Sequence, residues 1–425
     1  MAAVFFIAAI ALSGVLPLWL DEVIQLRETR GTTPAQLMSS LPGQPGAAPF
    51  GYLTQQALMR TTGYSVRWAR FPSAVFVAGA VLLVTLIGAE LGLSTPWLAG
   101  LLFALLPLTL RYACESRVYS QALFFATLST YLFSWIIKNP TWLAGALYCL
   151  ALTGAVYTQP YALFVAPAHL VWAITGRNYK ASACSIASAA VSVAAFLPWY
   201  LWSKTNWSSG ISGAGVRFVF SAKTPLMLFR EVAGAGYWGS GVLLILCAIA
   251  VARKTPRAGF LLLLLIGIPV VLALAADAMF GYFVATRQIL WALPAIAVLA
   301  AQGVARNHRV GLPLSALLAA LCLWQSFRYF TAPRENWQVA ADALSAEVRR
   351  GACMVVVPRE QAYSYQFFRP ELADAGCPAR LTVVAFTPYA TDIQRQAAIA
   401  ALMAEGYRKQ SGYEAGKSEI ALFAR

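Results

Sequence analysis

The chain has 425 residues, of which 59% are hydrophobic and only 12% are charged. This composition excludes an ordinary soluble globular protein and is typical of a protein that crosses a membrane many times. The net charge of +15 does not indicate nucleic-acid binding, because the stretch after residue 330 carries eleven basic and ten acidic residues and the excess lies in the apolar part.

Apolar runs long enough to span a bilayer recur along residues 1–330. The first covers residues 2–20 without a charge, and the others centre near residues 81, 103, 128, 148, 168, 192, 244, 267, 298 and 319. Inside a bilayer the backbone must satisfy its own hydrogen bonds, so runs of this length predict helices. The sequence therefore predicts an α-helical polytopic membrane domain with about eleven spans.

The polar breaks between the spans predict the orientation. Alternate short breaks contain eight basic residues and no acidic one, namely Lys138, Arg177, Lys180, Arg253, Lys254, Arg257, Arg306 and Arg309. Basic residues of short loops favour the cytoplasm. We therefore expect a bacterial cytoplasmic membrane protein whose residues 20–70, 204–235 and C-terminal tail lie outside. An excess of basic residues on that outer side suits an anionic ligand such as a lipid phosphate, or ordinary contact with lipid headgroups.

Two carboxylates, Asp21 and Glu22, follow directly on the first apolar run. Ionisable groups at the end of a span are costly and usually functional, although a solvated interfacial pair that only marks the end of the span is the alternative. In the outer loop that follows, Thr33 and Pro34 predict the start of a helix that runs to about Leu41. A second helix is predicted over residues 50–62, with Gly63 as its stop.

The break between the third and fourth spans, Arg111 to Ser120, gathers unusual charge at one membrane edge. Glu115 and Arg111 are four residues apart, so an ordinary helical ion pair is one interpretation. The other is a site, since a carboxylate can accept the proton of an acceptor hydroxyl, and arginines such as Arg117 and Arg287 can bind a phosphate. Carboxylates beside phosphate oxygens could also hold a divalent cation, Mg²⁺ or Mn²⁺.

The tail after residue 330 predicts a separate, small α/β domain, because helical stretches alternate with short apolar strands. The expected order is helix 337–350, strand 354–357, helix 361–374, strand 381–386, helix 392–405 and a terminal hairpin. Cys353 and Cys377 stand at the starts of two strands that a parallel βαβ unit would place side by side. We expect a disulfide between them, with two buried free thiols as the alternative.

The motifs together resemble the GT-C superfamily of polytopic glycosyltransferases, in the bacterial branch related to protein mannosyltransferases and the lipid A aminoarabinose transferase. The matched motifs, in chain order, are Trp19-Leu20-Asp21-Glu22, Ala48-Pro49-Phe50-Gly51-Tyr52, Arg67-Trp68-Ala69-Arg70-Phe71-Pro72-Ser73, Tyr112-Ala113-Cys114-Glu115-Ser116-Arg117-Val118-Tyr119, Arg287 through Leu293-Pro294, and Asn336-Trp337-Gln338. Two family histidines are replaced here, by Ala47 and by Gln159.

The resemblance implies an inverting transfer of a sugar from a polyprenyl-phosphate donor to a lipid, glycan or protein acceptor. Asp21 would be the general base, and Glu22 and Glu115 would support it, with Asp21 and Glu115 as ligands of any metal. Arg117 and Arg287 would bind the lipid phosphate. The other residues expected to contact the substrates are Tyr52, Tyr112 and Gln159.

Two other classes of function are compatible with the composition. A membrane transporter would usually show internal repeats and helices broken near the midplane, and neither is evident in the sequence. A non-catalytic membrane scaffold would need only the outer domain to bind a partner.

Overall fold

The structure is a computed structural model that describes residues 1–425 except 45–46, 214–222, 253–256, 281–284 and 374–379. The chain divides into two compact units. One comprises Met1–Ser13 and Glu28–Phe330, and the other comprises Gly14–Arg27 and Thr331–Arg425. The sequence-based division left residues 14–27 in the N-terminal membrane domain, whereas the structure groups them with the tail. We call the two parts the transmembrane unit and the C-terminal unit.

Among the described residues of the transmembrane unit, six helical stretches are long and apolar enough to cross a membrane. They are Val66–Glu90 (α5), Tyr119–Lys138 (α8), Tyr179–Lys204 within α11 (Tyr179–Gly213), Arg257–Met279 within α14 (Arg257–Phe280), Thr286–Arg306 (η3, Thr286–Ala292, and α15, Leu293–Arg306) and His308–Thr331 (α16). Two bent pairs raise the number to as many as eight: α6 (Pro96–Leu105) with α7 (Pro107–Ala113), and α12 (Lys223–Glu231) with α13 (Gly236–Val251).

Three shorter apolar stretches accompany these spans. They are α1 (Ala2–Leu12), α9 (Trp142–Thr158), and η2 (Pro160–Phe164) with α10 (Val165–Thr175). The chain is therefore an α-helical polytopic membrane protein, as the sequence predicts, and the number of about eleven spans stays a prediction.

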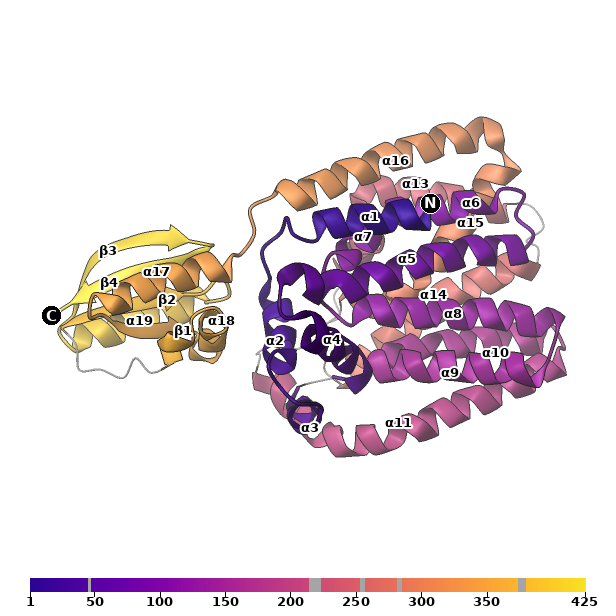
Figure 1. Ribbon diagram of the computed structural model, residues 1–425. Helices are drawn as coiled ribbons and strands as arrows, with labels where there is room; N and C mark the ends of the chain where they lie inside the picture. The colour runs from indigo at the N-terminus through magenta and orange to yellow at the C-terminus, as the bar shows by residue number, and fades with distance from the viewer. Residues whose placement is uncertain (45–46, 214–222, 253–256, 281–284, 374–379) are drawn as a thin grey trace. The chain divides into compact units, whose positions relative to one another are not determined.

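Helices α5, α8 and α9 pack side by side, and α1 lies along α5 (Figure 1). Elsewhere α13 packs on α15 and α10 packs on α14. The contact between α13 and α15 needs a glycine, because a Cβ at Gly303 would lie 2.0 Å from the carbonyl oxygen of Leu246. Small residues that let backbones approach are typical of helix pairs in membranes, where lipid offers no hydrophobic driving force for association.

The first helix is shorter than the apolar run predicts. It ends at Leu12 instead of continuing to residue 20, and the next helix, α2 (Leu20–Thr29), begins after a break that contains Gly14 and Pro17. Both residues disfavour a continuous helix. The buried Arg70 donates a hydrogen bond to the Ser13 carbonyl oxygen at 2.5 Å, so one C-terminal acceptor of α1 is satisfied by a guanidinium.

Two short helices after α2 form as predicted. Helix α3 (Pro34–Ser40) begins with a reciprocal cap, in which Thr33 and Gln36 each accept a hydrogen bond from the other's backbone N–H. After the single turn η1 (Leu41–Gly43), helix α4 (Pro49–Thr62) ends at Gly63, whose φ of 77° favours glycine. The region 204–235 was predicted as a long segment between spans, on the outer side. It is helical up to Gly213 and again in α12, and residues 214–222 lie outside the described part.

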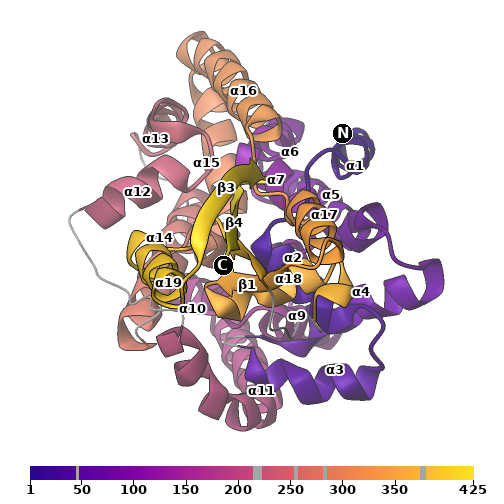
Figure 2. The same ribbon diagram turned by 90° about the vertical axis from the view of Figure 1, so that its left-hand side faces the viewer.

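The C-terminal unit contains a four-stranded sheet in the order β1-β2-β4-β3. Its strands are β1 (Cys353–Val357), β2 (Leu381–Phe386), β3 (Arg408–Ala415) and β4 (Ser418–Ala424). Strands β1 and β2 are parallel, and the β3–β4 hairpin joins β2 in antiparallel pairing. Helices α17 (Trp337–Arg349) and α19 (Asp392–Ala404) lie on either side of the sheet (Figure 2). The small α/β fold that the sequence predicts is confirmed.

One predicted helix of this unit is broken. In place of a single helix over residues 361–374 the structure has η4 (Arg359–Gln361), α18 (Ala362–Gln366) and η5 (Pro370–Ala373). Pro370 explains the break, since it disfavours helical backbone at the preceding residue. Cys353 is disulfide-bonded, and Cys377 lies outside the described residues, so the pairing of these two cysteines stays a prediction.

Candidate active site

The segment between α7 and α8 places a buried carboxylate next to an arginine. Glu115 is 1% exposed, and its Oε1 accepts a hydrogen bond from Arg111 Nε at 2.9 Å. The hydroxyl of Tyr329, in the last turn of α16, donates to the same oxygen at 2.6 Å. The guanidinium of Arg111 also lies 5.3 Å from the centre of the Tyr329 ring. The predicted ion pair is therefore present, although α7 ends at Ala113 and Glu115 lies beyond the helix, and Tyr329 links the pair to α16.

This environment suits a positioning group better than a base or a metal ligand. A carboxylate oxygen that accepts two short hydrogen bonds, one of them from a guanidinium, has most of its negative charge compensated. Among the described residues, no group of three or more His, Cys, Asp or Glu side chains could hold a metal ion. Glu115 is held by Arg111 and Tyr329, and a divalent cation shared by Asp21 and Glu115 stays a prediction, so we derive no step through one.

Two predicted phosphate ligands meet at one aromatic ring. The guanidinium carbons of Arg117 and Arg287 lie 5.5 and 5.8 Å from the centre of the Tyr119 ring, which is 5% exposed. Tyr112 packs edge-on against Tyr119, with ring centres 5.5 Å apart. Both arginines are partly exposed. Two guanidinium groups held on one ring make a positive site suited to an anion with several oxygens, such as a phosphate. Tyr119 is the last residue of the Tyr-x-x-Glu-x-Arg-x-Tyr motif, but the spacing of the motif did not predict a function for Tyr119.

The short helix η3, which carries Arg287, is held by a buried acid that the sequence reasoning missed. Asp277 of α14 is 1% exposed, and its Oδ1 accepts hydrogen bonds from the Tyr161 hydroxyl at 2.6 Å and from Gln288 Nε2 at 3.1 Å. Gln288 in turn accepts the backbone N–H of Ala285 at 2.9 Å and closes the first turn of η3. A lone acid near the end of an apolar run was the signal that could have identified Asp277.

The remaining predicted substrate contacts differ in their surroundings. Gln159 is partly exposed and precedes η2, where its backbone carbonyl accepts the Ala162 N–H at 3.0 Å. Tyr52 is 5% exposed and packs in an apolar cluster with Leu37 and Val156. Ala47, at a position where the family often has histidine, belongs to the same cluster. Their roles in binding stay predictions.

The acidic pair lies in the first turn of α2, within the C-terminal unit. Glu22 is fully buried, and its Oε2 accepts the backbone N–H of Trp19 at 3.3 Å, so it caps its own helix. Asp21 is partly exposed. Glu335 Oε1 accepts the backbone N–H of Leu20 at 2.5 Å, and Arg27 lies over the Tyr363 ring at 4.7 Å. These contacts explain why the segment groups with the tail.

Tyr389 and Glu335 lie in the surroundings of Asp21. Burial, followed by the charge and hydrogen bond of Glu335 and then the charge of Asp21, raises the pKa of the Tyr389 phenol. Asp21 is thus the exposed member of the pair and Glu22 the structural one. The predicted site residues fall into two groups: Asp21 and Glu22 in the C-terminal unit, and the others in the transmembrane unit.

Comparison with known proteins rests on structure alone. No protein-family model and no curated protein sequence matches the chain. ArnT from Cupriavidus metallidurans bound to undecaprenyl phosphate matches with a TM-score of 0.60 and 13% identity, over 99% of this chain and 96% of that chain. The apo state of ArnT matches with a TM-score of 0.61 and 11% identity, over 99% and 97%.

An archaeal protein matches more distantly. The apo oligosaccharyltransferase of Archaeoglobus fulgidus gives a TM-score of 0.51 and 13% identity, over 80% of this chain and 57% of that chain. At such identities a likeness shows the fold, and function must be argued from the site. The chain therefore has the fold of ArnT, over nearly its whole length.

Proposed function

We propose that this protein is an inverting glycosyltransferase that moves a sugar from a polyprenyl-phosphate donor to an acceptor hydroxyl at the outer face of the bacterial cytoplasmic membrane. The observation that carries the proposal is the convergence of Arg117 and Arg287 on Tyr119. The fold supports it, since a protein of the same fold, ArnT, was solved with undecaprenyl phosphate.

The arginines act on the leaving group. As the bond between the anomeric carbon and the phosphate oxygen breaks, negative charge grows on the phosphate, and two guanidinium groups stabilise that charge. Groups placed where charge develops contribute on the order of 100- to 1,000-fold in rate each. The partial exposure of both side chains leaves them accessible to a lipid phosphate.

Asp21 acts on the acceptor. Its carboxylate takes the proton of the acceptor hydroxyl while the hydroxyl oxygen bonds to the anomeric carbon and polyprenyl phosphate departs. A single displacement inverts the configuration at that carbon. Glu22 positions Asp21 by capping α2, and Glu115 positions the α7–α8 segment that carries Arg117. The acceptor, whether lipid, glycan or protein, is not specified by these groups.

The test is a transfer assay in proteoliposomes that contain the purified full-length chain and undecaprenyl-phosphate sugars. Transfer of label to an acceptor fraction, with release of undecaprenyl phosphate, is the expected result. A transporter would move the labelled lipid across the bilayer without releasing it, and a scaffold would bind without turnover. Either result would refute the proposal, provided that the same preparation still binds undecaprenyl phosphate.

A further inference from the structure

An exposed tyrosine stands on the loop that follows β2 in the C-terminal unit. Tyr389 is 46% exposed. Its loop lies at the carboxyl end of the parallel pair β1–β2, where the Thr387 backbone N–H donates to the Val357 carbonyl at 2.9 Å. In sheets with parallel strands, ligands commonly bind beyond this end.

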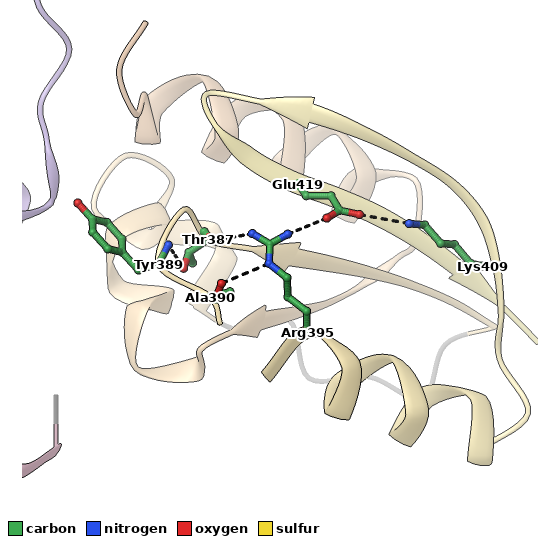
Figure 3. A network of polar contacts seen from close by, with 6 residues as sticks. All are labelled: Thr387, Tyr389, Ala390, Arg395, Lys409 and Glu419. Carbon is green, nitrogen blue, oxygen red and sulfur yellow. Dashed lines mark hydrogen bonds and ion pairs between the residues drawn. The ribbon is translucent and has the colours of Figure 1, made fainter. Parts of the chain in front are cut away.

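A polar network holds the loop (Figure 3). The guanidinium of Arg395 donates to the carbonyl oxygens of Ala390 at 3.3 Å and Thr387 at 3.4 Å. Glu419 accepts from Arg395 at 2.8 Å and from Lys409 at 3.2 Å, so the network reaches the β3–β4 hairpin. The Tyr389 ring points away from these groups (Figure 3). The backbone of the loop is thus held by Arg395, which does not contact the Tyr389 ring in this network.

The ring is backed by a buried aromatic pair. Trp337 stacks on Tyr389 with ring centres 6.4 Å apart and an interplanar angle of 6°, and Tyr365 packs edge-on against Trp337. Trp337 is 1% exposed. Its indole N–H has no hydrogen-bond partner within the described residues, which is uncommon for a buried donor. The result is a rigid aromatic surface with an unused donor at its base.

Two carboxylates accompany the ring. Glu335 hydrogen-bonds the Tyr389 hydroxyl and also accepts the Leu20 backbone N–H, which places the first turn of α2 beside it. Asp21, the next residue, interacts electrostatically with Tyr389. The positive charge of Arg334 also acts on Tyr389. Carboxylates accept hydrogen bonds from hydroxyls and a guanidinium donates them, so both kinds of group can bind the hydroxyls of a ligand.

An aromatic face beside carboxylates suits one class of ligand. A sugar ring has an apolar C–H face that packs on an aromatic ring, and hydroxyls around its edge that carboxylates can accept. We propose that Tyr389, Glu335 and Asp21 form a saccharide subsite that binds the acceptor and brings one of its hydroxyls to Asp21. This inference rests on the proposed function, and it specifies a glycan-bearing acceptor over a bare lipid or an unmodified protein.

The test measures saccharide binding without any donor. Saturation-transfer NMR on the full-length protein in detergent would use methyl glycosides of glucose, galactose, mannose and arabinose as probes at millimolar concentration. Tyr389→Leu removes the ring, and the signal should fall at least fivefold. Tyr389→Phe keeps the stacking and should retain most of the signal, while protease resistance of the C-terminal unit shows that both variants fold.

Tyr413→Leu is the matched control. Tyr413 is 39% exposed in the same unit, and its hydroxyl contacts a carboxylate, Glu347, at 3.4 Å. This variant should bind like the wild type. Equal signals in the wild type and Tyr389→Leu, or an equal loss in Tyr413→Leu, would overturn the proposal.

Competition separates the two sources of a sugar ring. If the subsite takes the acceptor, neither undecaprenyl phosphate nor an undecaprenyl-phosphate sugar displaces the methyl glycoside. Displacement by the sugar-bearing lipid alone would overturn the acceptor assignment and give the subsite to the donor's sugar. Failure to bind undecaprenyl phosphate at all would count against the proposed function, and it would leave the saccharide signal unaffected.

Discussion

Tyr329 donates its hydroxyl to Glu115 at 2.6 Å, a contact that joins the last turn of α16 to the α7–α8 segment. Because Glu115 is 1% exposed, losing this donor would leave a buried carboxylate less well satisfied. Such losses cost about 1–3 kcal/mol. Tyr329→Phe should therefore lower the thermal unfolding temperature in detergent. Tyr179→Phe, at an 80% exposed position, is the control and should leave it unchanged. Equal unfolding temperatures for the two variants would contradict the anchoring role of Tyr329.

Asp21→Asn keeps the size and polarity of the side chain but cannot accept a proton. If Asp21 is the general base, transfer should fall on the order of 100- to 10,000-fold. Asp392→Asn, at an exposed position of the same unit, controls for the loss of one charge. The readout is initial rate of transfer at equal amounts of folded protein. Activity within a few-fold of wild type would remove Asp21 from the mechanism.

Arg117→Lys and Arg287→Lys each keep the positive charge but lose the planar fork that binds two phosphate oxygens. We expect each to weaken undecaprenyl phosphate binding about tenfold, which corresponds to about 1.4 kcal/mol. Arg30→Lys is matched to them, because Arg30 also lies over a tyrosine ring, that of Tyr64, at 4.2 Å. If all three variants bound the lipid like the wild type, the arginines would be ordinary headgroup contacts.

Asp277 offers a test of positioning that separates geometry from charge. Asp277→Asn keeps an oxygen that can accept from Tyr161 and Gln288, whereas Asp277→Leu removes it. Asp277→Asn should preserve the KM for the donor. Asp277→Leu should raise that KM, because it frees the turn that carries Arg287, and it should change kcat less. Equal donor KM values in the two variants would show that the hydrogen bonds do not set the position of Arg287.

Local signals in the sequence account for the parts of the fold that were predicted. The cap at Thr33, the stop at Gly63 and strand β2 each depend on a few neighbouring residues, and each was found as expected. The ion pair of Arg111 and Glu115 is local too. Its third member, Tyr329, is 214 residues away from Glu115, and no periodicity indicates such a contact.

The same limit explains why residues 14–27 were not grouped with the tail. The sequence predicted an apolar run up to residue 20 and an outer loop after it, whereas the hydrogen bond from Leu20 to Glu335 joins residues 315 positions apart. Tyr119 was quoted as part of a motif, yet its meeting with both Arg117 and Arg287 depends on how α8 and η3 pack. Candidate site residues could thus be chosen from the sequence, but which of them lie together could be seen only in the tertiary structure.

The cysteines give the last prediction, which also tests the placement of the tail. Cys353 is disulfide-bonded, whereas Cys114, Cys149, Cys184, Cys247 and Cys322 are free thiols. We predict Cys377 as the partner of Cys353. A bridge that closes a loop of about 25 residues should stabilise the C-terminal unit by about 3 kcal/mol through its effect on the unfolded chain.

The measurement is mass spectrometry of protein that is denatured and alkylated without reductant and then digested. The five free cysteines should carry the alkyl group and serve as internal controls, and a peptide pair containing Cys353 and Cys377 should remain linked. Reduction before alkylation should release both. Disulfides persist in oxidising compartments. Alkylation of Cys353 and Cys377 without reductant would therefore contradict the bridge and weaken the placement of the tail outside the cytoplasmic membrane.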